Sequence, residues 1–352
     1  DRFRRLDFPF YYGARRGRFL RHALRAFPPT ALRGFVETHG LPLREEDLEK
    51  LFPVSQKARD VVDLLVDQVA AAGATLVTGQ AVRQVSRDGA EWVASTDDRT
   101  WRASSVVLAT GGLSYPKTGA TGDGYAFCRA QGHTITATFP ALAPLWLDAT
   151  WVRSLQGIVL DGVDLSVVGP DGRALGTRRR PILFTHKGLS GPAPMDLAGD
   201  VEELRGAARV RFDFAPGERA EDLDAHWLAT IAAHGTRRVE ALLPPQLPER
   251  VRAALVECAG CAGTLANLSR DARRRLLAVT KQLAVPVPRS LGYDHAEVTR
   301  GGVALDEVDP RTMQSRLAPG LFVCGELLDV DGPIGGFNFQ AAFATGRLAG
   351  LH

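Results

Sequence analysis

The sequence contains no uninterrupted apolar run of about 18 residues, which is the length that a membrane-spanning helix requires. We therefore expect no membrane span. Cysteine is also scarce, with four residues in a chain of 352. So few cysteines do not resemble a secreted disulfide framework, and we expect a reducing, cytoplasmic location. Histidine and cysteine show no zinc-ligand spacing, so no metal is expected.

Excess charge is small as well, because the formal net charge is only +3. The sequence also lacks interleaved basic and aromatic residues, which argues against nucleic acid as a partner. The run Arg178-Arg179-Arg180 is expected to be a solvated loop and not a phosphate site. We expect a small-molecule substrate and a protein that acts as a monomer or homo-oligomer.

The order of local patterns indicates an α/β protein of two or more domains. Residues 1–140 show helices, a small group of antiparallel strands, and then a buried strand that ends in glycines. This order is typical of part of an FAD-binding Rossmann domain. The local patterns change after residue 140, and residues 141–290 predict an inserted β-rich and helical domain. Residues 291–352 return to strand, glycine loop and helix, which predicts a discontinuous Rossmann-type domain.

Several local signals support this assignment. Ser55 is predicted to cap a helix and Gly73 to end it. Asp88 and Gly89 predict a tight turn between two alternating strands. Apolar spacing predicts helices over 17–27, 30–39, 56–72 and 338–351, and strands over 74–78, 81–86, 91–96, 105–109, 157–168, 181–185 and 321–324.

The strongest chemical signal follows the apolar strand 321–324. Gly325 permits close backbone approach, and the carboxylate of Glu326 can accept hydrogen bonds from ribose or ribityl hydroxyls. Gly335 and Gly336 lead into a helix, which presents free N–H groups and a positive dipole end. Such a helix start suits the negative charge that reduction places on a flavin ring. The predicted cofactor-binding residues here are Gly325, Glu326, Asp329, Gly335, Gly336, Phe337 and Asn338.

A second glycine-rich segment, 109–124, follows the strand 105–109. Its glycines and hydroxyls allow the backbone to pass near a bulky ligand. The glycine spacing does not match G-x-G-x-x-G, so this segment is no Rossmann fingerprint. The predicted cofactor-binding residues here are Thr110, Gly111, Gly112, Gly122 and Asp123.

These two segments occur together with PALAPL (140–145), FTHKGLSGP (184–192) and VTRGGV (298–303). In this order they resemble the YhiN-type flavoproteins, also described as aminoacetone-oxidase-family FAD-binding enzymes, which include bile-acid reductases of gut bacteria. The resemblance runs from about Arg18 to Gly350. It implies FAD as cofactor and an insertion that covers the flavin. A more distant similarity links 299–336 to fumarate-reductase-like and ketosteroid-dehydrogenase-like enzymes, which move hydride between flavin N5 and an activated C–C bond.

The resemblance also implies an N-terminal truncation. Family members begin with a strand and a G-x-G-x-x-G turn upstream of the point where this sequence starts, and the sequence has no initiator Met. We therefore expect the pyrophosphate cradle of FAD to lie outside these residues.

Three residues are candidates for catalysis. His186 is a predicted proton donor opposite flavin N5, because histidine titrates near neutral pH, although a structural turn histidine fits equally. Arg300 is a predicted substrate-facing arginine by analogy with fumarate-reductase-like enzymes. Tyr115 could hold an anionic substrate group or simply pack on the surface. The pair Cys258 and Cys261 is expected to be incidental and not a redox dithiol.

Together these features predict a bacterial FAD-dependent oxidoreductase. We expect hydride transfer from NAD(P)H, through flavin N5, to an unsaturated or conjugated-carbonyl small molecule. A flavin amine or aminoketone oxidase that uses O₂ is the alternative. An FAD-dependent RNA-modifying protein and a non-catalytic flavin-binding fragment are further alternatives.

Overall fold

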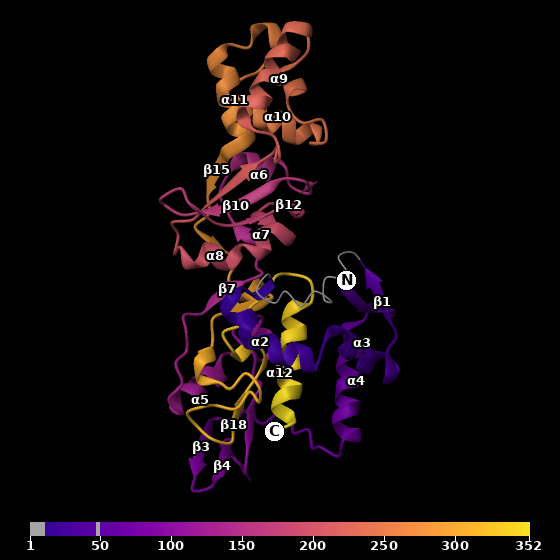
Figure 1. Ribbon diagram of the computed structural model, residues 1–352, viewed down its shortest axis with the longest axis vertical. Helices are drawn as coiled ribbons and strands as arrows, with labels where there is room; N and C mark the ends of the chain where they lie inside the picture. Colours follow the sequence, from indigo (N-terminus) through magenta and orange to yellow (C-terminus); the bar gives the residue numbers. More distant parts are fainter. Residues whose placement is uncertain (1–10, 47–49) are drawn as a thin grey trace. The chain divides into compact units, whose positions relative to one another are not determined.

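The computed structural model describes residues 11–46 and 50–352. The chain divides into two compact units: Asp1–Thr138 with Val298–His352 form unit 1, and Phe139–Glu297 form unit 2 (Figure 1). The functional domains predicted from the sequence, 1–140, 141–290 and 291–352, remain a prediction. Among the described residues no helix has both the length and the apolar character needed to cross a membrane.

Unit 1 begins with two helices that confirm their sequence patterns, α2 (Ala14–Ala26) and α3 (Pro29–Thr38). Pro29 stands at the first position of α3, where its fixed φ suits helix entry and its missing N–H costs nothing. A short antiparallel hairpin follows, made of β1 (Leu43–Glu46) and β2 (Lys50–Pro53).

Helix α4 (Ala58–Ala71) begins later than predicted. Its N-cap is Lys57, and the predicted cap Ser55 instead accepts a 3.4 Å hydrogen bond from the Lys57 amide. Gly73, with φ of 74°, follows the C-cap and confirms the predicted helix stop. The strand predicted over 74–78 is wrong. Leu76 is 57% exposed there, and none of the strands in residues 11–46 and 50–352 pairs with the backbone of this segment.

Three antiparallel strands come next in the order β3-β4-β5: β3 (Gln84–Asp88), β4 (Glu91–Ser95) and β5 (Thr100–Ala103). Asp88 pairs with Glu91, and Gly89 has φ of 60° between them, which confirms the predicted two-residue turn. Trp92 buries its ring in the core of unit 1.

Two distant segments form the sheet that carries the glycine turns. β6 (Val106–Leu108) runs parallel to β18 (Leu321–Val323), with Val106 opposite Leu321 and Leu108 opposite Val323. The elements around this sheet are η2 (Pro116–Thr118), α5 (Asp123–Ala130), β17 (Val298–Arg300), η6 (Leu305–Glu307), η7 (Gly325–Leu327) and α12 (Phe337–Gly350).

Helix α12 packs beside α2, so the first and last described helices of unit 1 lie together (Figure 1). The side chain of Gln340 donates to the carbonyl of Phe27 at 2.7 Å, and the hydroxyl of Tyr12 donates to the carbonyl of Phe337 at 2.8 Å. The guanidinium of Arg347 lies 5.3 Å from the Phe27 ring centroid.

Unit 2 contains two antiparallel sheets, in the orders β16-β8-β13-β12-β9 and β11-β10-β14-β15. Helices occupy residues 220–282, before the last two strands, β15 and β16. The sheets confirm the strand patterns over 157–168 and 181–185. Phe184, Phe212 and Trp227 are fully buried in one core. Its elements are β7 (Phe139–Ala141), β8 (Leu145–Trp146), α6 (Thr150–Ser154), β9 (Val159–Leu160), β10 (Asp164–Val168), β11 (Ala174–Arg178), β12 (Ile182–Thr185), β13 (Gly188–Ser190), α7 (Pro192–Asp196), α8 (Ala198–Glu203), β14 (Arg209–Asp213), α9 (Ala220–Ala233), η3 (Val239–Leu242), α10 (Glu249–Cys258), η4 (Leu265–Asn267), α11 (Arg270–Gln282), β15 (Leu283–Pro286), β16 (Arg289–Ser290) and η5 (Tyr293–His295).

Candidate functional site

The two glycine turns predicted from the sequence follow neighbouring parallel strands. Because β6 and β18 pair in parallel, their carboxyl ends meet at one edge of the sheet. Thr110, Gly111 and Gly112 follow β6 there, and Gly325 and Glu326 follow β18. Ligands of open α/β sheets bind outside the carboxyl ends of such strands, so the structure brings the two predicted segments together at the expected edge.

Thr299 joins these two turns. Its hydroxyl oxygen accepts hydrogen bonds from the amides of Leu113 at 2.8 Å and Ser114 at 3.2 Å. Its own amide donates to Oε1 of Glu326 at 3.0 Å. A Cβ on Gly112 would lie 2.6 Å from the Glu326 carboxylate, so only glycine leaves room for this packing.

The carboxyl of Glu326 lies largely inside the protein. Burial raises its pKa above the ordinary value of 4.5, while the hydrogen bonds from Thr299 act in the opposite direction. The bond to Thr299 engages Oε1, and Glu326 stays partly accessible. A carboxylate held in this way can accept a hydroxyl hydrogen bond from a ligand at the sheet edge.

The two residues that lead into α12, Gly335 and Gly336, have no side chains. Gly336 is its N-cap with φ of 86°, and a Cβ built there would meet no atom within 4 Å. Gly335 before it has φ of 129°, which only glycine adopts readily. Open space at the positive N-terminal end of a helix fits a planar, negatively charged group such as a reduced flavin ring. These residues therefore fit the isoalloxazine half of FAD.

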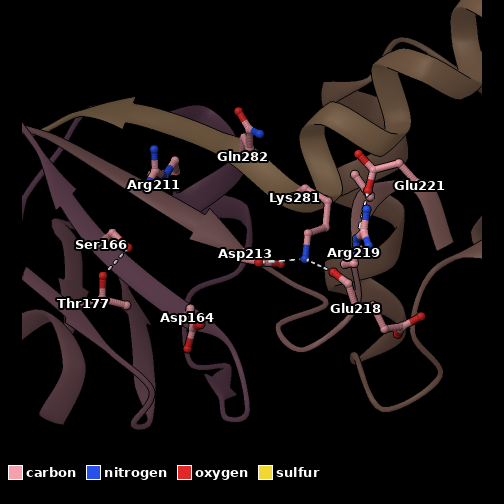
Figure 2. A pocket seen from close by; sticks show the side chains of 11 residues that line it. Asp164, Ser166, Thr177, Arg211, Asp213, Glu218, Arg219, Glu221, Lys281 and Gln282 are labelled. Atoms are coloured by element: carbon pink, nitrogen blue, oxygen red, sulfur yellow. Dashed lines mark hydrogen bonds and ion pairs between the residues drawn. The ribbon is translucent and has the colours of Figure 1, made fainter. Parts of the chain in front are cut away.

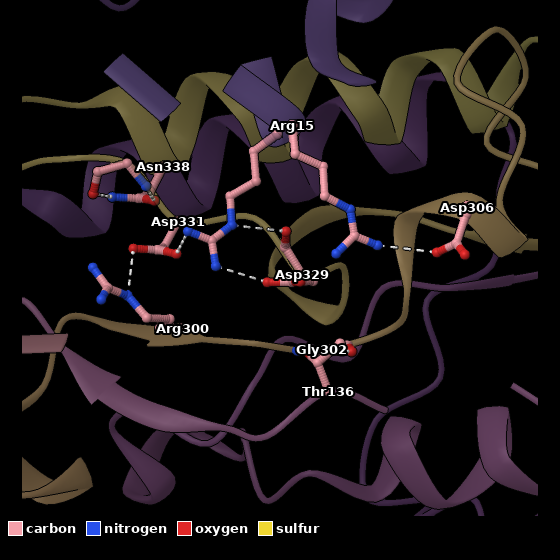
Figure 3. Close-up of polar contacts among 10 residues, drawn as sticks. Arg15, Thr136, Arg300, Gly302, Asp306, Asp329, Asp331 and Asn338 are labelled. Atoms are coloured by element: carbon pink, nitrogen blue, oxygen red, sulfur yellow. Dashed lines mark hydrogen bonds and ion pairs between the residues drawn. The ribbon is translucent and has the colours of Figure 1, made fainter. Parts of the chain in front are cut away.

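The other predicted residues of this loop are engaged with protein. The amide side chain of Asn338 donates to the carbonyl of Gly332 at 2.9 Å and accepts from its N–H at 2.8 Å, which closes the loop before α12 (Figure 3). The ring of Phe337 stacks on Tyr11 with 4.5 Å between centroids. Both residues shape the loop, and their contact with a cofactor remains a prediction.

A chain of alternating charges lies beside the same loop (Figure 3). The guanidinium of Arg16 bonds the carboxylates of Asp329 at 2.9 Å and Asp331 at 2.8 Å. Nε of Arg300 bonds the other oxygen of Asp331 at 3.1 Å. Asp329 therefore has an internal partner, and its predicted role toward the cofactor stays untested. Arg300 is held in place by a buried carboxylate, as a substrate-facing arginine requires.

The segment 110–124 forms two turns and then helix α5. Gly122 is the N-cap of α5 with φ of 84°, and Asp123 accepts a 3.0 Å hydrogen bond from the Thr121 hydroxyl. Tyr115 has φ of 54°, which is strained for a residue with a side chain, and its ring is half exposed. Its carbonyl accepts from the amide of Thr118 at 2.9 Å.

His186 belongs to unit 2 and stands in the exposed turn between β12 and β13.

The four cysteines differ in exposure. Cys258 is exposed and Cys261 buried. Burial raises the pKa of Cys128 to about 12 and that of Cys324 to about 11, which makes both thiols poor nucleophiles.

A separate polar cavity of about 520 Å³ lies in unit 2 (Figure 2). Lys281 reaches across it and pairs with Asp213 at 2.8 Å while donating to the carbonyl of Glu218 at 2.7 Å. The hydroxyls of Ser166 and Thr177 bond each other at 2.8 Å. Much of its polar lining is thus satisfied internally, and no predicted site residue lines it.

The family pattern described as the HI0933-like protein Rossmann domain matches residues 7–352. The chain belongs to this family. Family membership confirms the YhiN-type resemblance and the α/β Rossmann fold class.

Three relatives extend the picture of this family. A protein of Escherichia coli (strain K12), named ribosomal RNA dihydrouridine synthase, is 30% identical over 96% of this chain and 82% of its own length. A Haemophilus influenzae protein of the same name is 27% identical over 97% and 84%. The 3-dehydro-bile acid delta(4,6)-reductase of Clostridium scindens is 29% identical over 85% and 74%. A reductase within a Rossmann flavoprotein family supports an FAD-dependent oxidoreductase in general.

Besides Thr299, two positions of the site were not predicted from the sequence. The hydroxyl of Thr345 accepts the amide N–H of Gly325 at 3.0 Å and so ties α12 to the end of β18. Arg16 anchors the loop 329–331 from helix α2. Neither residue stands in a glycine motif, and only the helix packing brings them to the site.

Proposed function

We propose that this protein is an FAD-dependent reductase of a carbon–carbon double bond conjugated to a carbonyl, with NAD(P)H as the electron donor. The observation that carries the proposal is the meeting of two glycine turns and Glu326 at the carboxyl edge of β6 and β18. The residues at this edge would hold FAD, which would supply the chemistry of hydride transfer between NAD(P)H and the substrate. We also propose that the protein acts in a reducing cytoplasm, where NAD(P)H is plentiful.

The residues of the chain have distinct tasks in this proposal. Gly325 and Glu326 would hold ribityl hydroxyls. The positive N-terminal end of α12 after Gly336 would stabilise the negative charge of the reduced ring. Arg300, oriented by Asp331, would polarise the substrate carbonyl. Hydride then adds to the carbon β to the carbonyl, and a proton reaches the α carbon from His186 or water, so substrate, NAD(P)H and one proton become reduced product and NAD(P)⁺.

The relatives' names agree with this reaction type. A delta(4,6)-reductase of a 3-dehydro-bile acid removes double bonds conjugated to a carbonyl. Formation of dihydrouridine from uridine likewise saturates a carbon–carbon bond conjugated to a carbonyl. The two activities differ in substrate and share the chemistry that we propose.

An anaerobic assay tests the proposal. The complete protein should purify with FAD and consume NAD(P)H under nitrogen only when a conjugated enone is present, giving a product heavier by two hydrogens. A complete protein that binds no FAD would refute the proposal. Peroxide release with an amine and no pyridine nucleotide would point to an oxidase instead.

RNA is the second candidate substrate, and the names of two relatives favour it. In that case the same reduction would act on a uridine of ribosomal RNA. Ribosomal RNA from a strain lacking the gene would then lack a dihydrouridine that the complemented strain contains.

A further inference from the structure

Strand β17 presents two neighbouring side chains to two different parts of the candidate site. Thr299 bonds the turns after β6 and β18, and the next residue, Arg300, bonds Asp331 in the loop before α12. Successive side chains of a strand point to opposite sides, so both contacts follow from one short strand. The backbone is fixed directly afterwards, because Gly301 has φ of 86° and a Cβ there would lie 2.1 Å from the carbonyl oxygen of Ala137. The main chain at Arg300 therefore has little freedom to move.

The direction of the Arg300 guanidinium is set by Asp331. Nε of Arg300 donates to Oδ2 of Asp331 at 3.1 Å (Figure 3). A guanidinium is planar, so a bond at Nε fixes the plane in which the two terminal nitrogens lie. The two side chains are only 14% and 8% exposed, and a charged hydrogen bond is strong in such a setting. The orientation of the Asp331 carboxylate therefore decides where Arg300 can donate.

The other oxygen of this carboxylate is held from helix α2. Nη1 of Arg16 lies 2.8 Å from Oδ1 of Asp331 and forms an ion pair with it. Nη2 of the same guanidinium bonds Asp329 at 2.9 Å, which keeps Arg16 itself in place. The carboxylate of Asp331 cannot rotate about its Cβ–Cγ bond without leaving the cation at Oδ1. Oδ2 consequently stays directed at Arg300.

We propose that Arg16 is a positioning residue of the active site, which acts on the substrate through Asp331 and Arg300. Arg16 fixes Asp331, Asp331 fixes Arg300, and Arg300 donates to the carbonyl oxygen of the substrate. All three residues belong to unit 1. This inference rests on the proposed reduction, in which negative charge develops on that oxygen as hydride adds to the β carbon. It assigns a role in that reaction to a residue of helix α2.

Binding of an oxyanion tests the inference without turnover. 4-Nitrophenolate carries negative charge on an oxygen attached to a conjugated ring, as the substrate does during hydride addition, and nitrobenzene is its uncharged counterpart. Equilibrium dialysis of the complete, FAD-loaded protein gives both dissociation constants. The wild type should bind the phenolate more tightly than nitrobenzene. Arg300→Met should weaken the phenolate about tenfold to a hundredfold, the size of a lost hydrogen bond to a charged group.

Arg16→Lys is the decisive variant. It keeps the positive charge, but an ammonium on a flexible stem cannot bond Asp329 and Asp331 in the geometry of the planar guanidinium. The substitution should weaken the phenolate about fivefold, which lies within the range of coupling inside one ion-pair network, and should leave nitrobenzene unchanged. In the Arg300→Met background the same substitution should have no further effect on the phenolate, because Arg16 acts only through Arg300.

Two control variants separate positioning from stability. Arg15→Lys changes the neighbouring arginine of α2, which pairs with Asp306 at the surface. Ser315→Ala removes a buried hydroxyl that contacts His133 and so lowers the stability of unit 1 through other residues. Both controls should bind the phenolate and nitrobenzene as the wild type does.

Three outcomes overturn the inference. They are a wild type that does not prefer the phenolate, an unchanged phenolate affinity in Arg300→Met or in Arg16→Lys, and an equal loss through Arg16→Lys with and without Arg300. Failure of the proposed function looks different. There, the wild type and the variants show the expected affinities, yet the FAD-loaded protein never reduces a conjugated enone with NAD(P)H.

Discussion

The amide of Thr299 donates a 3.0 Å hydrogen bond to the carboxylate of Glu326, while the Thr299 hydroxyl accepts the amide N–H of Leu113. One residue of β17 thereby connects the turn after β6 with the turn after β18. Both turns belong to the proposed FAD site, so the shape of that site depends on a side chain outside the two turns.

Thr299→Val should loosen this connection. It leaves the amides of Leu113 and Ser114 without their acceptor in a buried setting, which costs about 1–3 kcal/mol. We expect a lower urea midpoint and weaker FAD binding. Thr299→Ser keeps the hydroxyl and should stay close to wild type in both measurements. Equal behaviour of the Val and Ser variants would contradict the role that we assign to the hydroxyl.

Because of Glu326, the free energy of unfolding should fall as the pH rises. Its pKa is raised in the folded protein above the ordinary 4.5, so the folded state holds the proton more tightly than the unfolded state. The resulting stabilisation is fully present below pH 4.5 and is lost as pH rises through the folded pKa. Urea unfolding across pH 4 to 8 should show this decline in wild type and not in Glu326→Gln.

Glu307 provides a control of opposite sign. Burial alone would raise its pKa, but hydrogen bonds from Thr134 and His133 outweigh it and lower the pKa below 4.5. Its stabilisation is present above pH 4.5 and is lost as pH falls through the folded pKa. Glu307→Gln should therefore remove pH dependence only on the acid side. The same pH profile for both variants would contradict these two assignments.

Arg16→Met should destabilise unit 1 strongly. The substitution leaves the carboxylate of Asp329, whose side chain is 10% exposed, without its cation, and it leaves the 8% exposed Asp331 paired with Arg300 alone. Breaking such a buried pair costs about 3–5 kcal/mol. The neighbouring Arg15 pairs with Asp306 at the surface, so Arg15→Met should cost only about 0–1 kcal/mol. Similar urea midpoints for the two variants would show that burial of this network matters little.

His133 contacts Glu307 at 3.0 Å through Nδ1 and Ser315 at 2.8 Å through Nε2, an arrangement that resembles a hydrolytic triad. Ser315 is 4% exposed, and its oxygen also accepts the amides of Leu317 and Ala318. We expect no labelling of Ser315 by a fluorophosphonate. Ser315→Ala should lower stability by about 1–3 kcal/mol and leave substrate reduction intact. Covalent labelling of Ser315 would reveal a second activity.

The strands and glycine turns of the site were predictable because each is a local pattern. The apolar run 321–324 followed by Gly325-Glu326, and the run 105–109 followed by Gly111-Gly112, specify strand ends from neighbouring residues alone. The two runs form neighbouring parallel strands, as expected of a Rossmann-type domain. The predicted turn at Gly89 held for the same reason, since the residues that specify it are adjacent.

The remaining features depend on long-range contacts. Leu113 and Thr299 lie 186 positions apart, and no local pattern indicates that they touch. The run 74–78 has strand composition, yet a strand also needs a partner backbone, which composition does not provide. Asp329 is followed by Val330 and Asp331 in a glycine-containing loop, which resembles a ligand-binding segment, but Arg16 supplies its counter-charge from helix α2.

The packing of α2 against α12 has a consequence for biosynthesis. Tyr12, Arg16 and Phe27 contact residues within 329–347, which leave the ribosome after all of unit 2. The core of unit 2 is built entirely from residues 139–297 and can close while residues 298–352 are still being translated. Unit 1 must wait with its apolar helix face uncovered, so chaperones and proteases meet the nascent protein chiefly at that half.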